Sequence, residues 1–178
     1  MTKIINLLGG PGSGKSTTAA GLFYRLKLSG HKVELVTEYA KDLTYEKRFS
    51  TLDNQLYVFA KQWHRIQRIK DQVDYIITDS PILLSCIYDN GTLPSSFEPL
   101  VIDIWNRDDN VIFYMNRPVV YQEYGRNHSY EQAVKVDGFT KLFIEKHNLD
   151  YSVIESTPEA PIEIMKKLGL YRERTYRD

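Results

Sequence analysis

The sequence opens with a short apolar run that leads into Gly9-Gly10-Pro11-Gly12-Ser13-Gly14-Lys15-Ser16. This octapeptide fits the phosphate-loop pattern G-x-x-x-x-G-K-[ST] at every fixed position. The apolar residues 4–8 before it predict a buried strand, and residues 15–29 after it have a helical pattern. Glycines let backbone N–H groups turn toward a phosphate, and a helix N-terminus attracts anions. The stretch therefore predicts a site for a nucleoside triphosphate.

The residue types in this loop also predict separate roles in binding. Lys15 is long enough to reach the β- and γ-phosphates and to offset charge during transfer, and Ser16 offers a hydroxyl to Mg²⁺. ATP and Mg²⁺ are the expected cofactors, with the choice between ATP and GTP left open. The predicted ATP contacts in this region are Gly10, Gly12, Ser13, Gly14, Lys15, Ser16 and Thr17.

Apolar runs alternate with helical patterns along the rest of the chain. Strands are predicted at 3–8, 33–37, 75–78, 111–115 and 151–154, and helices at 15–29, 52–72, 82–89, 98–107, 131–147 and 160–168. This alternation is typical of an α/β domain whose parallel sheet is covered by helices on both faces. We therefore expect a three-layer P-loop NTPase fold with a five-stranded parallel sheet.

The composition is that of an ordinary globular domain, and we expect one domain over residues 1–178. Of the residues, 42% are hydrophobic and 26% are charged, with a formal net charge of zero. No apolar run approaches the roughly 20 residues of a membrane span, and the first strand begins too early for a signal peptide. The lone cysteine, Cys86, fits a reducing compartment. We expect a cytoplasmic protein with no membrane partner.

Two carboxylates directly follow predicted strands. Ligands of a parallel sheet bind at the carboxyl ends of its strands, so Glu38 and Asp79 are expected to face the same crevice as the loop. Glu38 is predicted to act as a general base that also contacts the acceptor, with a solvated turn residue as the alternative. Asp79 is predicted to hold Mg²⁺ and to take part in catalysis; it could also cap the next helix, which begins near Pro81.

A polar segment follows the fourth strand and contains two arginines. We expect residues of about 117–130 to form a lid in which Arg117 contacts ATP and Arg126 acts in catalysis. Arginines in such a segment can neutralise charge as it spreads over a transferring phosphoryl group. An ordinary surface loop with ion pairs is the alternative.

The long predicted helix after Glu38 carries amides beside aromatic rings, which would suit a nucleobase. Gln55, Phe59 and Gln62 lie close to one face at helical spacing. We predict that these three residues, with Glu38 and Tyr39, bind the acceptor. Aromatic residues at this spacing are also common in a hydrophobic core, which is the alternative for Phe59.

These motifs resemble those of P-loop nucleoside and nucleotide kinases, and most closely the ribosylnicotinamide-kinase-like, AAA-type small ATPases common in bacteriophages. The resemblance spans about residues 3–155 and depends on the phosphate loop, Thr37-Glu38-Tyr39, Thr78-Asp79-Ser80-Pro81 and the segment from Arg117 to Arg126. Deoxynucleoside kinases have a similar layout. The resemblance implies that Glu38 is the base and that Asp79 helps to hold magnesium.

Three functions are open at this point. The first is transfer of the ATP γ-phosphoryl group to a hydroxyl or phosphate of a nucleoside or nucleotide. The second is phosphorylation of a hydroxymethylated pyrimidine within phage DNA, which would place the protein in the host cytoplasm; the zero net charge speaks mildly against it. The third is a nucleotide-dependent switch or ATPase module, which the absence of an Asn-Lys-x-Asp motif disfavours. The oligomeric state is open too, a homodimer included.

Overall fold

The computed structural model describes residues 1–117 and 129–172. Its centre is a five-stranded sheet in the order β2-β3-β1-β4-β5. All four strand pairs are parallel. The strands are β1 (Lys3–Leu8), β2 (Val33–Val36), β3 (Tyr75–Thr78), β4 (Asp109–Asn116) and β5 (Tyr151–Glu155). The predicted five-stranded parallel sheet and three-layer α/β fold are confirmed.

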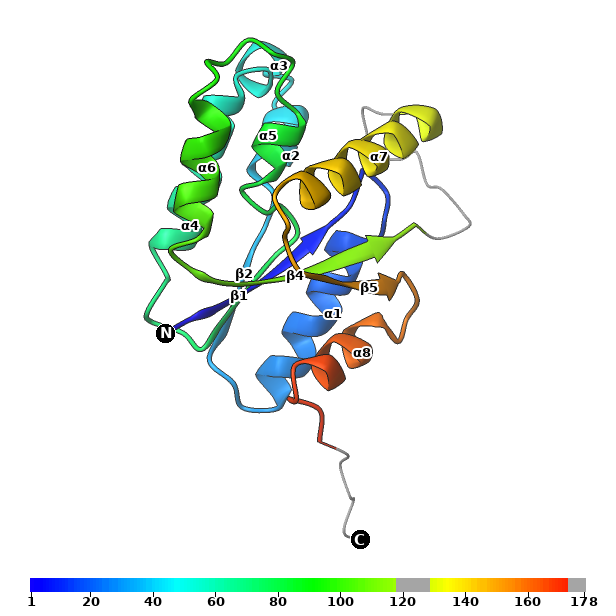
Figure 1. Ribbon diagram of the computed structural model, residues 1–178. Helices are drawn as coiled ribbons and strands as arrows, with labels where there is room; N and C mark the ends of the chain where they lie inside the picture. The colour runs from blue at the N-terminus through cyan, green and yellow to red at the C-terminus, as the bar shows by residue number, and fades with distance from the viewer. Residues whose placement is uncertain (118–128, 173–178) are drawn as a thin grey trace, which may run out of the picture.

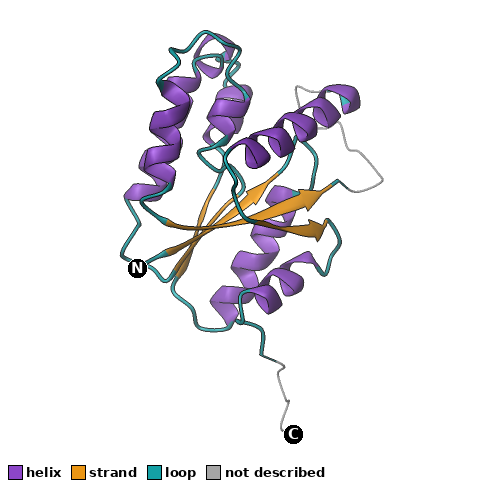
Figure 2. Ribbon diagram, viewed as in Figure 1, coloured by secondary structure: helices purple, strands orange, loops and turns teal. Residues whose placement is uncertain are grey.

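Helices cover both faces of the sheet (Figures 1 and 2). One face carries α1 (Lys15–Leu28) and α8 (Ala160–Lys167), and the other carries α4 (Gln55–Gln67), α5 (Leu84–Ile87), α6 (Phe97–Trp105) and α7 (Tyr130–Lys146). Two shorter helices, α2 (Tyr39–Tyr45) and α3 (Phe49–Leu52), follow β2 and pack against α4. No helix in the described ranges is both long and apolar enough to cross a bilayer.

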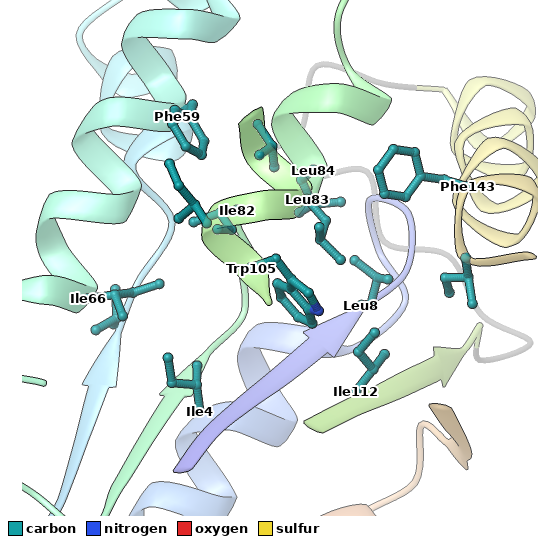
Figure 3. Close-up of a cluster of buried hydrophobic side chains, with 14 of the residues drawn as sticks. Ile4, Leu8, Phe59, Ile66, Ile82, Leu83, Leu84, Trp105, Ile112 and Phe143 are labelled. Carbon is teal, nitrogen blue, oxygen red and sulfur yellow. The ribbon is translucent and has the colours of Figure 1, made fainter. Parts of the chain in front are cut away.

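The alternation of β1 divides the core into two clusters. Successive side chains of a strand point to opposite faces, so Ile4 and Leu8 pack beneath α4–α7, while Ile5 and Leu7 pack against α1 and α8. Figure 3 shows the first of these clusters, with Trp105 near its centre. Burying each such side chain contributes about 1.5–3 kcal/mol, so this central strand is held firmly in place.

The strand register brings the ends of three strands together. Thr78 of β3 pairs with Asn6 of β1 on one side and with Val36 of β2 on the other. The turns that follow these strands therefore begin at one edge of the sheet. This is the edge at which the phosphate loop leaves β1.

The region between β2 and α4 differs from the sequence prediction. A single helix was expected from residue 52, but α2 and α3 come first and α4 begins at Gln55. The side chain of Asn54 accepts a hydrogen bond from Tyr57 N–H, which fixes that start. Later in the chain, Ser129 and Gln132 form a capping box at the N-terminus of α7.

Candidate functional site

The phosphate loop leaves β1 and ends at the first turn of α1. Gly14 is the N-terminal cap of α1, with φ 84°. A Cβ at this position would lie 2.8 Å from the Ser156 hydroxyl, which donates to Ser13 C=O. A side chain at residue 14 would therefore meet both backbone strain and the loop that follows β5. Only glycine suits this position.

Lys15 folds back over its own loop. Its Nζ donates to Gly9 C=O at 2.7 Å and to Gly10 C=O at 2.8 Å. Burial lowers the pKa of this ammonium from its ordinary value, while the nearby carboxylates of Glu38 and Asp79 act in the opposite direction. The positive charge is thus positioned at the centre of the loop, held by carbonyl groups that a phosphate could replace.

The two predicted carboxylates lie near Lys15 and near each other. Burial raises the pKa of Glu38; Lys15 opposes this effect and the Asp79 carboxylate adds to it. Asp79 is 5% exposed, and its Oδ1 has no hydrogen-bond partner among the described residues. The Ser13 hydroxyl is also buried and has no hydrogen-bond partner among the described residues. Buried polar atoms without partners are uncommon and often indicate that a ligand or ion completes the site.

The residues at this edge fit a magnesium ion that is held partly by a nucleotide. Ser16 is exposed at the start of α1, and Asp79 brings the unpartnered carboxylate oxygen. No group of three or more His, Cys, Asp and Glu side chains that could hold a metal occurs in the described part of the chain. Magnesium commonly uses one or two protein oxygens together with phosphate and water, so this sparse donor set suits it.

Arg117 lies at the phosphate loop and is held there by Asp137, a partner that the sequence analysis missed; its predicted contact with ATP stays a prediction. Asp137 of α7 accepts from Arg117 Nε at 2.9 Å and Nη2 at 2.7 Å, and its other oxygen accepts from Gly10 N–H at 2.7 Å. Arg117 Nη1 also donates to Pro11 C=O. No sequence signal marked Asp137, because one acid on a helical pattern is usually solvent-exposed. Arg126 and most of the predicted lid fall in 118–128, outside the described residues.

A cleft of about 540 Å³ joins the phosphate loop to the region of α2–α5. Its walls include most of the predicted loop contacts and three of the predicted acceptor contacts. These residues are Gly12, Gly14, Lys15, Ser16, Thr17, Glu38, Gln55 and Gln62. The cleft is continuous from the expected phosphate site to Glu38.

The other predicted acceptor residues lie elsewhere. Tyr39 is outside the cleft wall; its ring lies under the Arg65 guanidinium at 5.0 Å, and its hydroxyl is 3.4 Å from that of Tyr57. Phe59 lies within the core and is 3% exposed (Figure 3). The centroid of its ring is 6.0 Å from that of Trp63 and 5.6 Å from that of Phe97. The core alternative for Phe59 is therefore the one that the structure supports. Its ring is used inside the protein and does not face the cleft.

Comparisons with solved structures agree with the fold. Many solved chains share it, and three examples follow. The deoxyadenosine kinase from M. mycoides with bound dATP has 19% identity and a TM-score of 0.59, covering 93% of this chain and 99% of that one. The same kinase with products dCMP and dCDP has 20% identity and a TM-score of 0.61, covering 94% and 100%. The thymidylate kinase from Ehrlichia chaffeensis has 18% identity and a TM-score of 0.65, also covering 94% and 100%.

Sequence comparison gives a family. None of the curated proteins matches the chain in sequence. The family described as "AAA domain" matches residues 4–160, which contain the phosphate loop, both carboxylates, Arg117 and Asp137. Because this match covers most of the sequence, the chain belongs to the AAA domain family.

Proposed function

We propose that this protein is an ATP- and Mg²⁺-dependent kinase that transfers the γ-phosphoryl group to a hydroxyl of a nucleoside-like molecule. The observation that carries the proposal is the single cleft in which Lys15 and the phosphate loop adjoin Glu38. Phosphoryl transfer needs two molecules placed in line and developing charge offset by cations, with little covalent participation by the protein. The fold shared with deoxyadenosine and thymidylate kinases supports the same class of reaction.

The charges of the acceptor side favour a hydroxyl over a phosphate as the receiving group. Beyond Lys15, the only Lys or Arg among the described residues that line the cleft is Lys41, and two carboxylates, Glu38 and Asp53, accompany it. A nucleoside monophosphate would bring about two more negative charges against those acids. A neutral nucleoside meets no such repulsion.

The chain's own residues then have distinct roles. Glu38, whose pKa is raised by burial, accepts the proton of the attacking hydroxyl. Lys15 exchanges the carbonyls of Gly9 and Gly10 for phosphate oxygens. Ser16 and Asp79 would hold magnesium, which neutralises phosphate charge when bound. Arg117, paired with Asp137 and donating to Pro11 C=O, holds the shape of the loop.

The test is to incubate the protein with ATP and Mg²⁺ and a panel of nucleosides and their monophosphates. Nicotinamide riboside belongs in the panel because the sequence resembles ribosylnicotinamide-kinase-like ATPases. Product is read by chromatography, with Lys15→Met and Glu38→Gln as inactive controls. We expect a phosphorylated nucleoside, and no product from monophosphates. ATP hydrolysis with no phosphorylated acceptor would contradict the proposal and favour an ATPase module.

A second candidate places the acceptor hydroxyl on a base of DNA. The rim of the cleft offers some support, because Tyr45 lines it while 64% exposed and the Lys41 ammonium lies 6.0 Å from its ring. An exposed ring beside a cation can stack on an unpaired base and attract a nucleic-acid backbone. Labelled-phosphate transfer to single-stranded DNA that contains hydroxymethyluracil tests this candidate against the free nucleoside.

A further inference from the structure

Gln62 of α4 lies at the cleft with its amide already occupied by the protein. Its Oε1 accepts from Tyr39 N–H at 3.0 Å, and its Nε2 donates to Thr37 C=O at 3.3 Å. These two groups are the immediate neighbours of Glu38 in the chain. The same Nε2 donates to Thr78 Oγ1 at 3.4 Å, and the Gln62 side chain is 2% exposed.

The third bond extends the connection to the second carboxylate. Thr78 precedes Asp79, and its Oγ1 also accepts from Ser80 N–H at 3.1 Å. One buried amide and one buried hydroxyl therefore join the turn of Glu38 to the turn of Asp79. The Gln62 and Thr78 side chains that hold these turns are 2% and 0% exposed, and hydrogen bonds of buried groups are strong and costly to lose.

We propose that Gln62 is a positioning residue that fixes the Glu38 and Asp79 carboxylates relative to each other, and that it does not recognise the acceptor base. The proposal rests on the kinase function given above. An amide has one oxygen acceptor and two N–H donors, and three hydrogen bonds engage both ends of the Gln62 amide. To bind a base edge, Gln62 would have to release Tyr39 N–H or Thr37 C=O.

Gln55 provides a natural contrast on the same helix. It also lines the cleft, but its amide makes a local hydrogen bond, from Nε2 to Leu52 C=O at 2.9 Å. Two glutamines of one helix therefore face one cleft with different surroundings. Replacing each by methionine, which is similar in length and apolar, separates positioning from recognition.

The experiment measures steady-state kinetics with ATP and at least three acceptors for the wild type, Gln62→Met, Gln55→Met and Thr78→Val. We expect Gln62→Met to lower kcat at least tenfold by a similar factor for every acceptor. KM for ATP should stay within twofold, and the preference order among acceptors should not change. Thr78→Val should act in the same direction, although Thr78 is fully buried and cannot touch an acceptor. Gln55→Met should instead change the KM for each acceptor by a different factor.

A structural readout keeps the test independent of turnover. Tyr39 N–H should exchange with deuterium at least tenfold faster in Gln62→Met than in the wild type, while the Leu22 amide of α1 exchanges at the same rate in both. A changed acceptor preference in Gln62→Met with kcat retained would overturn the proposal, as would unchanged Tyr39 exchange. If the wild type phosphorylates no acceptor, the proposed function fails instead. If Gln62→Met does not fold, Thr78→Val decides: kcat equal to wild type would refute the proposal.

Discussion

Asp137 allows a direct test of the loop geometry, because one carboxylate joins three donors. It accepts from Gly10 N–H and from two nitrogens of Arg117, all within 2.9 Å. The Arg117 and Asp137 side chains are only 10% and 18% exposed. Asp137→Ala therefore removes the carboxylate from a mostly buried guanidinium and leaves the Gly10 amide without this acceptor.

The magnitude follows from this burial. Removing one partner of a buried ion pair costs about 3–5 kcal/mol. Since both side chains keep some contact with water and Arg117 still has Pro11 C=O, we expect the lower end, about 3 kcal/mol. For a domain of this size, that loss lowers the melting temperature by about 6–12 °C. Asp137→Asn keeps an oxygen for Gly10 N–H but loses the charge, so about half of that decrease is expected.

Thermal unfolding followed by circular dichroism, with and without ATP and Mg²⁺, measures both effects. The matched control is Glu145→Gln, which removes one negative charge from an exposed position of the same helix. A nucleotide at 100 times its Kd adds about 2.7 kcal/mol to the stability of a protein that binds it. That increase should shrink in Asp137→Ala, because the loop is no longer held in shape. If Asp137→Ala lowers the melting temperature by less than about 2 °C, this reasoning is refuted.

Three further predictions concern the loop, the core and the base. Gly14→Ala should abolish stabilisation by ATP in thermal unfolding, because φ is 84° and the new Cβ would lie 2.8 Å from the Ser156 hydroxyl; normal stabilisation would contradict this. Phe59→Ala should lower the free energy of unfolding, measured in urea, by about 3–5 kcal/mol and leave KM for the acceptor within twofold of wild type. A large change in KM at unchanged stability would indicate instead that Phe59 contacts the acceptor. The transfer rate should rise as the pH increases through the pKa of Glu38, which burial raises above its ordinary value, because a general base must first lose its proton. Glu38→Gln should abolish this pH dependence of the rate. A rise that persists in Glu38→Gln would exclude Glu38 as the base.

The fold was predictable because its signals are local. Apolar runs of four to six residues gave β1, β2, β3 and β5 within one residue of their ends, and the glycine pattern placed α1 directly after β1. The rule that ligands bind at the carboxyl ends of parallel strands then pointed to Glu38 and Asp79, and the strand register brings the starts of both turns together. None of these steps needs knowledge of a distant contact.

The supporting contacts were not predictable because they are set by packing between distant segments. Asp137 reaches Gly10 across 127 positions, and no local pattern reveals which face of α7 turns toward the loop. Gln62 was noticed as an amide near the site, but its pairing with Thr37 and Tyr39 depends on how α4 lies over the end of β2. The buried position of Phe59 was not predictable for the same reason, since it depends on the packing of its ring near Trp63 and Phe97.

The charge balance of the site explains why nucleotide binding should require a divalent cation. Among the described residues around the loop, Arg117 is paired with Asp137, and the positive charges that act on Glu38 are those of Lys15 and Lys41. A triphosphate adds about four negative charges, and two unit charges 4 Å apart interact by about 4 kcal/mol at an effective dielectric constant of 20. The cations among the described residues at the site are too few to offset such an excess. A magnesium ion that entered with the nucleotide would supply two positive charges beside Asp79, whose buried Oδ1 has no hydrogen-bond partner among the described residues.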